Sequence, residues 1–203
     1  MVYIFDRLDQ YTDEAYEKHL FSLPAWRREK ALRYKKLDDR KRSVLAFVLL
    51  ERALREEYGI TEVPEFVYNE FGKPSLPNLP IHFSLSHCKD AVACAVSDNN
   101  IGIDVESIVP YNHDVARRVC TAAELEMLAQ SADKDVDFIK LWTVKEAISK
   151  YEGRGLSLIF KEIETRNYMI HTDLCTNEKC VVSICYLKDH LQIACRAIYV
   201  QVI

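Results

Sequence analysis

Residues 138–150, with the sequence Phe-Ile-Lys-Leu-Trp-Thr-Val-Lys-Glu-Ala-Ile-Ser-Lys, predict an amphipathic helix with charged side chains close to its apolar side. At 3.6 residues per turn, Trp142, Glu146 and Lys150 lie one above another. Lys145 lies on the neighbouring flank. A carboxylate is thus bracketed by ammonium groups beside an indole ring. An ordinary surface ion pair between Glu146 and Lys150 also explains the pattern, and such a pair contributes only about 0.3–0.5 kcal/mol.

The composition is that of a globular protein. Apolar residues make up 49% of the 203 residues and charged residues 29%, with 5 glycines, which excludes a disordered or fibrous chain. This length fits one large domain or two halves of about 100 residues each. Helical and strand segments follow each other in both halves, which favours an α+β fold with two similar lobes, although residue identities show no internal repeat.

Net charge, hydropathy and cysteine usage indicate which partners and which cellular compartment to expect. The net charge is −4, which argues against nucleic acid, although residues 27–42 are strongly basic and form either a solvated face or an anion site. The apolar run at residues 46–50 is far too short to cross a membrane, so we expect a cytoplasmic protein without a membrane partner. The seven cysteines lack a C-x-x-C pair and are expected to be buried thiols in a reducing compartment.

The first hundred residues predict a strand, three helices and a strand pair. In order, these are a strand over residues 1–6, a helix from Thr12 to about Ser22, a helix opened by Pro24, a long helix capped by Asp38 or Asp39 and closed by Gly59, and strands over residues 81–85 and 91–96. A third strand over residues 101–106 is expected to extend the pair into an antiparallel meander.

Later in the chain, Thr121 and Glu124 form a capping-box signature for a helix that ends near Gln130. The helix that contains Trp142 is expected to end at Tyr151. Three further strands are predicted over residues 162–169, 181–187 and 191–200.

Asp104 and Glu106 lie two residues apart on a predicted strand, so their side chains share one face with α-carbons roughly 6.6 Å apart. Paired carboxylates suit a hard cation, although an isolated Asp-x-Glu is more often two solvated acids. Glu146 adds a third carboxylate, and the chain supplies many cations: Arg27, Lys30, Arg42, Lys73, His87, Lys145 and Lys150. Carboxylates around one Mg²⁺, ringed by cations, would describe a polyphosphate site. Lys73 on its Gly-Lys-Pro turn is otherwise an exposed loop lysine.

Four motifs resemble the Sfp-type 4'-phosphopantetheinyl transferases in order and spacing. They are Phe71-Gly-Lys-Pro74, Phe83-Ser-Leu-Ser-His87, Ile101-Gly-Ile-Asp-Val-Glu106 and Trp142-Thr-Val-Lys-Glu-Ala-Ile-Ser-Lys150. The basic helix at residues 27–30, Arg42 and residues 152–157 are also similar, so the resemblance covers most of the chain. No single motif is specific, but their common order makes coincidence implausible.

The resemblance implies two α+β lobes related by a pseudo-twofold axis, each with a small antiparallel sheet and packed helices, at residues 1–100 and 101–203. The active site would lie in the cleft between them. It also implies a monomeric, Mg²⁺-dependent enzyme, with Mn²⁺ as an alternative metal, whose partners are coenzyme A and an apo acyl or peptidyl carrier protein of fatty acid, polyketide or nonribosomal peptide biosynthesis. A carrier serine would attack the β-phosphorus of coenzyme A and release 3',5'-ADP.

By the same resemblance, Asp104, Glu106 and Glu146 would bind the metal, with Glu146 also the base for the serine. Lys150 would stabilise or protonate the leaving phosphate. The coenzyme A phosphates would be bound by Arg27, Lys30, Arg42, Lys73, Ser86 and His87. Lys145 matches the family lysine of the Trp-x-x-Lys-Glu motif, and for it phosphate binding and a supporting role behind the site stay as alternatives. Glu124 corresponds to a family glutamate near the metal, so its capping role and a supporting role at the site stay as alternatives.

The loop after Ser86-His87 departs from the family pattern. Cys88 and Lys89 follow Ser86-His87, where the family often has a small hydroxyl residue and glycine.

A coenzyme A or nucleotide binding module without turnover is the alternative function, and retention of all three carboxylates argues against it. A basic-helix RNA binder is a third candidate, weakened by the acidic pI and by the lack of interleaved aromatics over residues 27–42.

Overall fold

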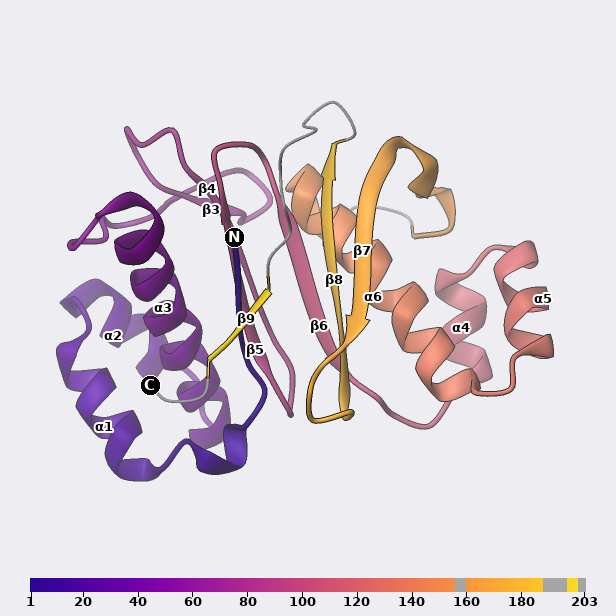
Figure 1. Ribbon diagram of the computed structural model, residues 1–203, viewed down its shortest axis with the longest axis horizontal. Helices are drawn as coiled ribbons and strands as arrows, with labels where there is room; N and C mark the ends of the chain where they lie inside the picture. The colour runs from indigo at the N-terminus through magenta and orange to yellow at the C-terminus, as the bar shows by residue number, and fades with distance from the viewer. Residues whose placement is uncertain (156–159, 188–196, 201–203) are drawn as a thin grey trace.

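The computed structural model describes residues 1–155, 160–187 and 197–200. Two sheets pack face to face, and a long helix covers the outer face of each, giving an α/β/β/α order of layers across the molecule (Figure 1). The predicted α+β class is confirmed. Within the described part of the chain, no helix has both the length and the hydropathy needed to cross a bilayer.

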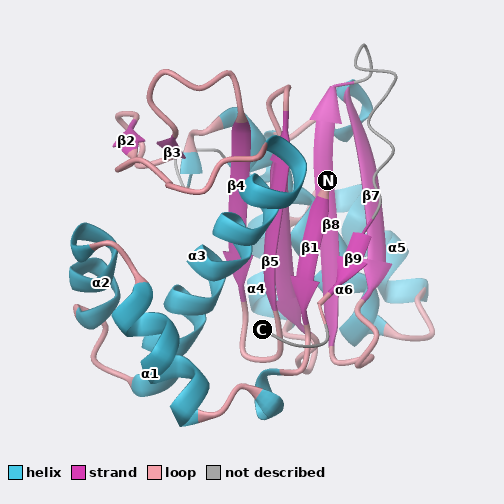
Figure 2. Cartoon of the chain, turned by 60° about the vertical axis from the view of Figure 1, so that its left-hand side comes forward, coloured by secondary structure: helices cyan, strands magenta, loops and turns pink. Residues whose placement is uncertain are grey.

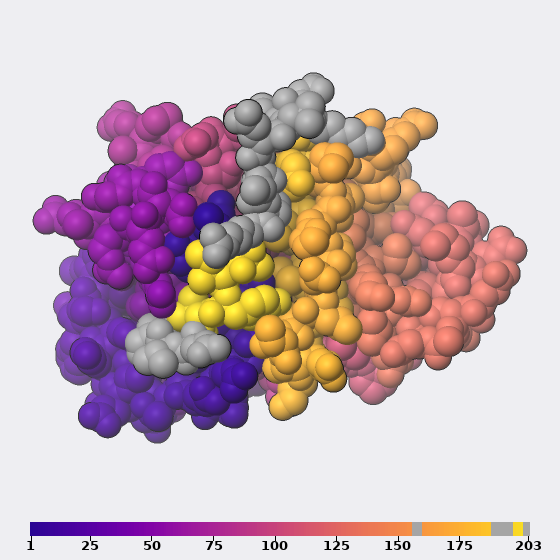
Figure 3. Space-filling model, in the orientation of Figure 1, coloured from indigo at the N-terminus to yellow at the C-terminus, as the bar shows by residue number. Residues whose placement is uncertain are grey.

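The first sheet has the strand order β4-β5-β1-β9, with bounds His82–His87, Val92–Ser97, Val2–Phe5 and Ala197–Tyr199. Strand β9 runs parallel to β1, and the other pairs are antiparallel. In the space-filling view, the yellow atoms of β9 lie at the surface between the N-terminal and C-terminal parts of the chain (Figure 3). The last described strand therefore belongs to the first sheet, and the predicted division at residues 100 and 101 stays a prediction.

Helices α1, α2 and α3 span Asp13–Ser22, Ala25–Leu32 and Leu37–Tyr58. Helix α3 packs across the first sheet, as Figure 2 shows. Strand β5 shows why the sheet is buried on both sides. Val92, Cys94 and Val96 face α3, while Ala93 and Ala95 face the second sheet. These small alanine side chains allow the two sheets to approach closely.

The second sheet is antiparallel, with the order β6-β8-β7 and bounds Gly102–Ser107, Cys180–Leu187 and Tyr168–Leu174. Helix α6 (Lys134–Glu152) covers its outer face, and α4 (His113–Val119) and α5 (Ala122–Gln130) pack beside it (Figure 1). A two-stranded ribbon, β2 (Val67–Tyr68) and β3 (Pro74–Ser75), and short 3-10 turns at Leu8–Gln10 (η1), Phe160–Glu162 (η3) and Thr165–Asn167 (η4) complete the described elements. The twofold relation between the lobes stays a prediction.

The predicted meander of three strands is wrong at its last step, because β6 pairs with β8 and not with β5. Strand β5 already has β4 on one edge and β1 on the other. Where β4 meets β6, serine hydroxyls take the place of a backbone ladder. Ser84 Oγ accepts from the Ile103 N–H at 3.1 Å, and Ser86 Oγ accepts from the Val105 N–H at 3.3 Å. We call this junction the serine seam.

Several predicted boundaries are confirmed. Thr12 caps α1, Thr121 and Glu124 form a complete capping box on α5, and Gly59 ends α3 in the left-handed conformation. Lys36, and not Asp38 or Asp39, is the N-cap of α3. Both aspartates lie in its first turn, where their charges still favour the helix dipole.

The strand predicted over residues 162–169 is wrong for most of its length. Turn η3 ends at Glu162, η4 occupies Thr165–Asn167, and β7 begins only at Tyr168. The strand at residues 181–187 is confirmed as β8. Of the strand predicted over 191–200, residues 191–196 lie outside the described residues, and β9 covers 197–199. The described cysteines are free and buried, as predicted.

Gly102 is the point of closest contact between β6 and α6. A Cβ at this position would lie 2.0 Å from the Ala147 carbonyl oxygen and 2.6 Å from the Tyr151 amide nitrogen. Both are backbone atoms, so no side-chain rotation can relieve the clash. The absence of a side chain at Gly102 therefore sets how closely α6, with Glu146 and Lys150, approaches the sheet.

We expect Gly102→Ala to lower the free energy of unfolding by about 3 kcal/mol or more, because overpacking against backbone must displace α6. Gly59→Ala is the matched control. Gly59 has φ +68°, and no atom of the described residues lies within 4 Å of where an added methyl group would sit, so only backbone strain of about 1–2 kcal/mol is expected. Urea unfolding followed by circular dichroism measures both, and equal losses would contradict the close-contact explanation.

Candidate active site

One pocket of about 360 Å³ lies beside the serine seam, between α2, α3, β4, β6 and α6. It brings together eight of the eleven residues that the sequence predicted for the site: Arg27, Lys30, Ser86, His87, Asp104, Glu106, Glu146 and Lys150. The remaining three, Arg42, Lys73 and Lys145, lie elsewhere. Residues that are more than a hundred positions apart in the chain thus share one cavity.

Asp104 is the most buried carboxylate of the pocket, with 2% of its surface exposed. Its Oδ1 accepts hydrogen bonds from Ser86 Oγ at 2.8 Å and from Lys150 Nζ at 2.7 Å. Its Oδ2 is also buried and has no hydrogen-bond partner in the described protein. A buried carboxylate oxygen without a partner is costly, so Asp104 retains the capacity to bind a further cation or donor.

Glu106 and Glu146 face the same cavity from β6 and α6. Burial raises the pKa of Glu106 to about 7, and the negative charges of Asp104 and Glu146 add to this shift. Burial and the charge of Asp104 likewise raise the pKa of Glu146, while Lys150 opposes the increase. The charges of the three carboxylates thus act on one another, and Asp104 and Glu106 line the same pocket, as expected from their alternation along the strand.

The donor set fits a hard cation in its chemistry, because the available ligands are carboxylate oxygens and one of them, Asp104 Oδ2, lacks a partner within the described residues. Among the residues that the structure describes, however, no three Asp, Glu, His or Cys side chains are arranged to hold a metal ion. The positive charge at Asp104 comes instead from Lys150. The i,i+4 pair between Glu146 and Lys150 is not formed, since Lys150 bonds to Asp104 and Ser86.

Arg27 is a buried cation of α2 that is only partly satisfied. Its Nη2 donates to the carbonyl and hydroxyl oxygens of Ser43, and its guanidinium carbon lies 5.4 Å from the centre of the Phe47 ring. Its Nε and Nη1 atoms are buried and have no partner in the described protein. Burial lowers the pKa of Arg27, yet the group stays charged, so two donors are available for an anion.

Lys30 and His87 lie around the same cavity. Lys30 Nζ donates to the Tyr68 hydroxyl at 2.8 Å and lies 4.7 Å from the centre of that ring. Partial desolvation lowers the pKa of His87, and the charges of Arg42 and Lys150 lower it further. A neutral imidazole retains one N–H donor for an anionic ligand.

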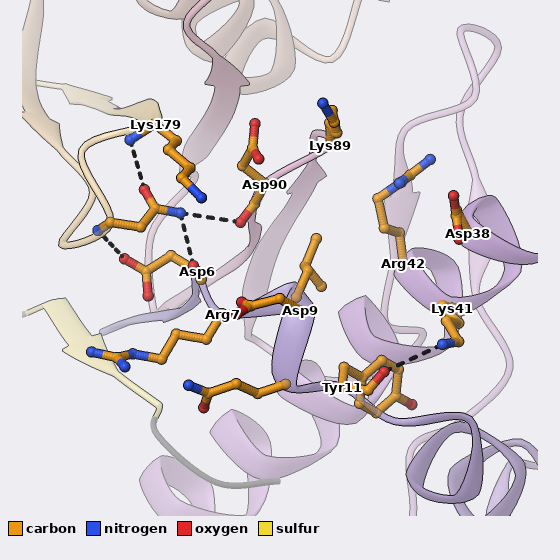
Figure 4. Close-up of a pocket in the computed structure, with 13 residues that line it drawn as sticks. Asp6, Arg7, Asp9, Tyr11, Asp38, Lys41, Arg42, Lys89, Asp90 and Lys179 are labelled. Carbon is orange, nitrogen blue, oxygen red and sulfur yellow. Dashed lines mark hydrogen bonds between the residues drawn. The ribbon is translucent and has the colours of Figure 1, made fainter.

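Arg42 lines a different pocket of about 520 Å³, formed by η1, the start of α3 and the turns that follow β4 and β7. Figure 4 shows this pocket, with Lys89 also among its lining residues. Arg42 pairs with Asp39. Its charge nevertheless acts on His87, so it lies near the junction of the two pockets.

Lys73 holds the turn between β2 and β3 against the end of α6. Its Nζ donates to Asn100 Oδ1 at 2.8 Å and to the Tyr151 carbonyl at 3.0 Å, and burial lowers its pKa to about 8. Asn69 donates to the Gly153 carbonyl and fastens the same turn. Sequence reasoning missed Asn69 and Asn100. The only signal was Asn69 at the start of a Gly-Lys-Pro turn, a position where asparagine often accepts from following backbone amides.

Lys145 does not line the pocket, and of its two predicted roles its contacts fit support of the site rather than phosphate binding. The side chain is 1% exposed, and its ammonium group donates to the Val119 carbonyl at 2.8 Å, Glu124 Oε2 at 2.7 Å and the Phe160 carbonyl at 3.1 Å. All three ammonium donors are therefore used within the protein. Glu124 combines its capping box with this ion pair, so it supports α4, α5 and α6 together.

We expect Lys145→Met to lower the free energy of unfolding by about 3–5 kcal/mol, because it leaves a carboxylate and two carbonyls without their buried partner. Lys140→Met is the control, since Lys140 pairs with Asp137 on the exposed side of the same helix and should contribute only about 0–1 kcal/mol. Urea unfolding measures both. A Lys145→Met protein as stable as the control would contradict the structural role.

Comparison with known proteins identifies the family of the chain. The ACPS family profile, described as the 4'-phosphopantetheinyl transferase superfamily, matches residues 100–195. The 4'-phosphopantetheinyl transferase Sfp of Bacillus subtilis (strain 168) is 33% identical over 166 residues, which cover 80% of this chain and 73% of Sfp. The 4'-phosphopantetheinyl transferase AcpT of Escherichia coli (strain K12) is 33% identical over 134 residues, covering 63% of this chain and 69% of AcpT.

Among solved structures, the holo-[acyl-carrier-protein] synthase AcpS of Thermotoga maritima aligns with 43% of this chain and 62% of its own, at 18% identity and a TM-score of 0.36. That likeness is too weak to support a conclusion. The identity to Sfp over most of both chains is sufficient by itself. This chain belongs to the 4'-phosphopantetheinyl transferase superfamily.

Proposed function

We propose that this protein transfers the 4'-phosphopantetheine arm of coenzyme A to a serine of an apo acyl or peptidyl carrier protein. The products are the holo-carrier and 3',5'-ADP. The observation that carries the proposal is the single pocket in which Asp104, Glu106 and Glu146 face Arg27, Lys30 and Lys150. Family membership supplies the reaction, and the pocket supplies the groups that such a reaction requires.

In this reaction the serine hydroxyl oxygen attacks the β-phosphorus of coenzyme A. A new phosphorus–oxygen bond forms to serine, and the bond from that phosphorus to the bridging oxygen of the pyrophosphate breaks. Glu146 accepts the serine proton, and because burial and the charge of Asp104 raise its pKa, Glu146 is a stronger base than an ordinary carboxylate. Lys150 neutralises or protonates the departing phosphate of 3',5'-ADP.

Asp104, Glu106 and Glu146 would hold a divalent cation, Mg²⁺ or alternatively Mn²⁺. When bound, such an ion neutralises phosphate charge and polarises the phosphorus centre. The support in this chain is the carboxylate donor set and Asp104 Oδ2, which has no partner among the described residues. Glu124 is assigned to holding α5 and α6 together, because its ion pair is made to Lys145 and not toward the pocket.

The coenzyme A phosphates would be bound by Arg27, Lys30, Ser86 and His87. Arg27 offers two buried donors that no described residue satisfies, and Lys30 and His87 line the same cavity. Arg42 would bind a phosphate where the two pockets meet, since its charge already lowers the pKa of His87. Lys73 lies outside this cavity and is bonded to Asn100 and Tyr151, so it would contact a phosphate only after releasing them.

We also propose that the protein is a cytoplasmic monomer, with its two lobes related by an internal twofold axis. The described cysteines are free and buried, which is consistent with a reducing compartment. Each lobe contains a long helix packed on a sheet, α3 in the first and α6 in the second, which is the repeat that such an axis would relate.

The experiment that tests the function is incubation with coenzyme A, Mg²⁺ and a panel of apo-carriers, followed by mass spectrometry of each carrier. A phosphopantetheine increment on one serine, together with release of 3',5'-ADP, is expected. Binding of coenzyme A without any increment on the panel would favour the alternative, a binding module without turnover.

We expect Glu146→Gln to reduce turnover by about 100- to 10,000-fold, because it removes the general base and a carboxylate ligand while keeping the side-chain shape. The measurement is holo-carrier formation across a Mg²⁺ titration, with circular dichroism as the fold control. Near-normal turnover at low Mg²⁺ would contradict both roles. Full recovery at high Mg²⁺ would leave Glu146 as a ligand but not as the base.

His87→Ala should mainly weaken coenzyme A binding, because we assign His87 to donating a hydrogen bond to a phosphate and Glu146 to taking the serine proton. Steady-state kinetics should show a raised KM for coenzyme A with a much smaller change in kcat. Unchanged coenzyme A binding combined with lost turnover would instead give His87 a chemical role.

A further inference from the structure

We propose that Lys150 is an internal counter-ion that occupies Asp104 in the resting site, so that a divalent cation binds only as Lys150 is released toward the substrate phosphates. This inference rests on the proposed function and adds a step to it. The metal and coenzyme A would then bind cooperatively, because the phosphates take up the ammonium group that the metal displaces.

The contact that carries the inference is tertiary. Lys150 Nζ lies 2.7 Å from Asp104 Oδ1 and 2.7 Å from Ser86 Oγ, and these residues come from α6, β6 and β4. Glu146 is one turn away on the same helix, yet the lysine does not pair with it. The ammonium group of Lys150 thus pairs with the buried carboxylate of Asp104 and not with the carboxylate of Glu146, which is nearer in sequence.

The need for a cation follows from burial. Only 2% of Asp104 is exposed, and one of its oxygens already lacks a partner among the described residues. Removing the only cation that contacts it, among the residues described, would leave an uncompensated buried charge beside two other carboxylates. The site therefore requires a positive charge at Asp104 at all times, supplied either by Lys150 or by a metal ion.

An ammonium group and a divalent cation at one carboxylate repel each other, so the two compete for Asp104. Lys150 is able to leave, because 29% of its side chain is exposed and its four-carbon stem is flexible. It lines the same pocket as Arg27 and His87, on which the phosphates would bind, so a released ammonium group remains within the cavity.

If Lys150 competes with the metal, removing its charge should tighten metal binding. If Lys150 only assisted metal binding, the same change should weaken it. Without coenzyme A, Lys150→Met and Lys150→Gln should bind Mn²⁺ about tenfold or more tightly than the wild type, because the competing charge is gone. Lys150→Arg, which keeps the charge, should not gain affinity. Lys140→Met, on the exposed side of α6, should bind Mn²⁺ like the wild type.

Mn²⁺ binding is measured by electron paramagnetic resonance and by calorimetry on the full-length protein, with and without coenzyme A. In the wild type, coenzyme A should tighten Mn²⁺ binding, and in Lys150→Met and Lys150→Gln this enhancement should shrink. Asp104→Asn combined with Lys150→Gln should abolish the gain, which locates the ion at Asp104. The two uncharged variants differ in hydrogen bonding, so if one fails to fold, the other carries the comparison.

Equal or weaker Mn²⁺ binding by both uncharged variants in the absence of coenzyme A would overturn the proposal. So would a gain of the same size in Lys150→Arg. The carrier assay on the wild type separates this outcome from failure of the proposed function. If the wild type modifies a carrier while Lys150→Gln shows no gain in Mn²⁺ affinity, only the counter-ion proposal is wrong.

Discussion

The serine seam between β4 and β6 is the interaction on which the rest of the site depends. Ser84 and Ser86 accept backbone N–H groups of β6, which keeps the two sheets joined where no backbone ladder forms between these described strands. Each hydroxyl can both accept and donate, so Ser86 also donates to Asp104 while it accepts from Lys150. The residue that joins the sheets is therefore also the residue that orients the central carboxylate.

The seam requires close approach, and small residues provide it. Alanines of β5 face the second sheet, and Gly102 lets the backbone of α6 come against β6. Because α6 lies this close, Lys150 reaches across to Asp104. A larger residue in either place would separate the layers and with them the groups that line the pocket.

Polar groups buried around the pocket divide into two kinds. Lys145 uses all three ammonium donors on internal acceptors, which is the pattern of a group that holds the fold. Arg27 and Asp104 retain buried atoms without a partner in the described part of the chain, which costs stability and is tolerated where a ligand supplies the missing bond. Lys145 and Lys150 are five residues apart on α6, yet Lys145 is buried among internal acceptors, whereas Lys150 lines the pocket and is 29% exposed.

Local sequence determined the helices and their ends, because capping residues and glycine at a left-handed position act within a few residues. Thr12, Thr121 and Gly59 are examples. It also determined that Asp104 and Glu106 share a face, since alternation along a strand is a local property. The resemblance of motifs to a known family named eight residues that gather in the pocket and three that lie elsewhere, and it did not predict the bonds that they make.

Only the tertiary structure decided which strand β6 pairs with, where Lys145 points and which carboxylate Lys150 binds. These depend on contacts between segments that are distant in sequence, such as the bond between Lys150 and Asp104, which are 46 positions apart. Helical spacing places Glu146 one turn from Lys150. Lys150 pairs with Asp104 instead, because the more deeply buried carboxylate needs a counter-ion more. The sequence therefore determined the inventory of charged groups, and packing decided which of them neutralise one another and which remain available for a ligand.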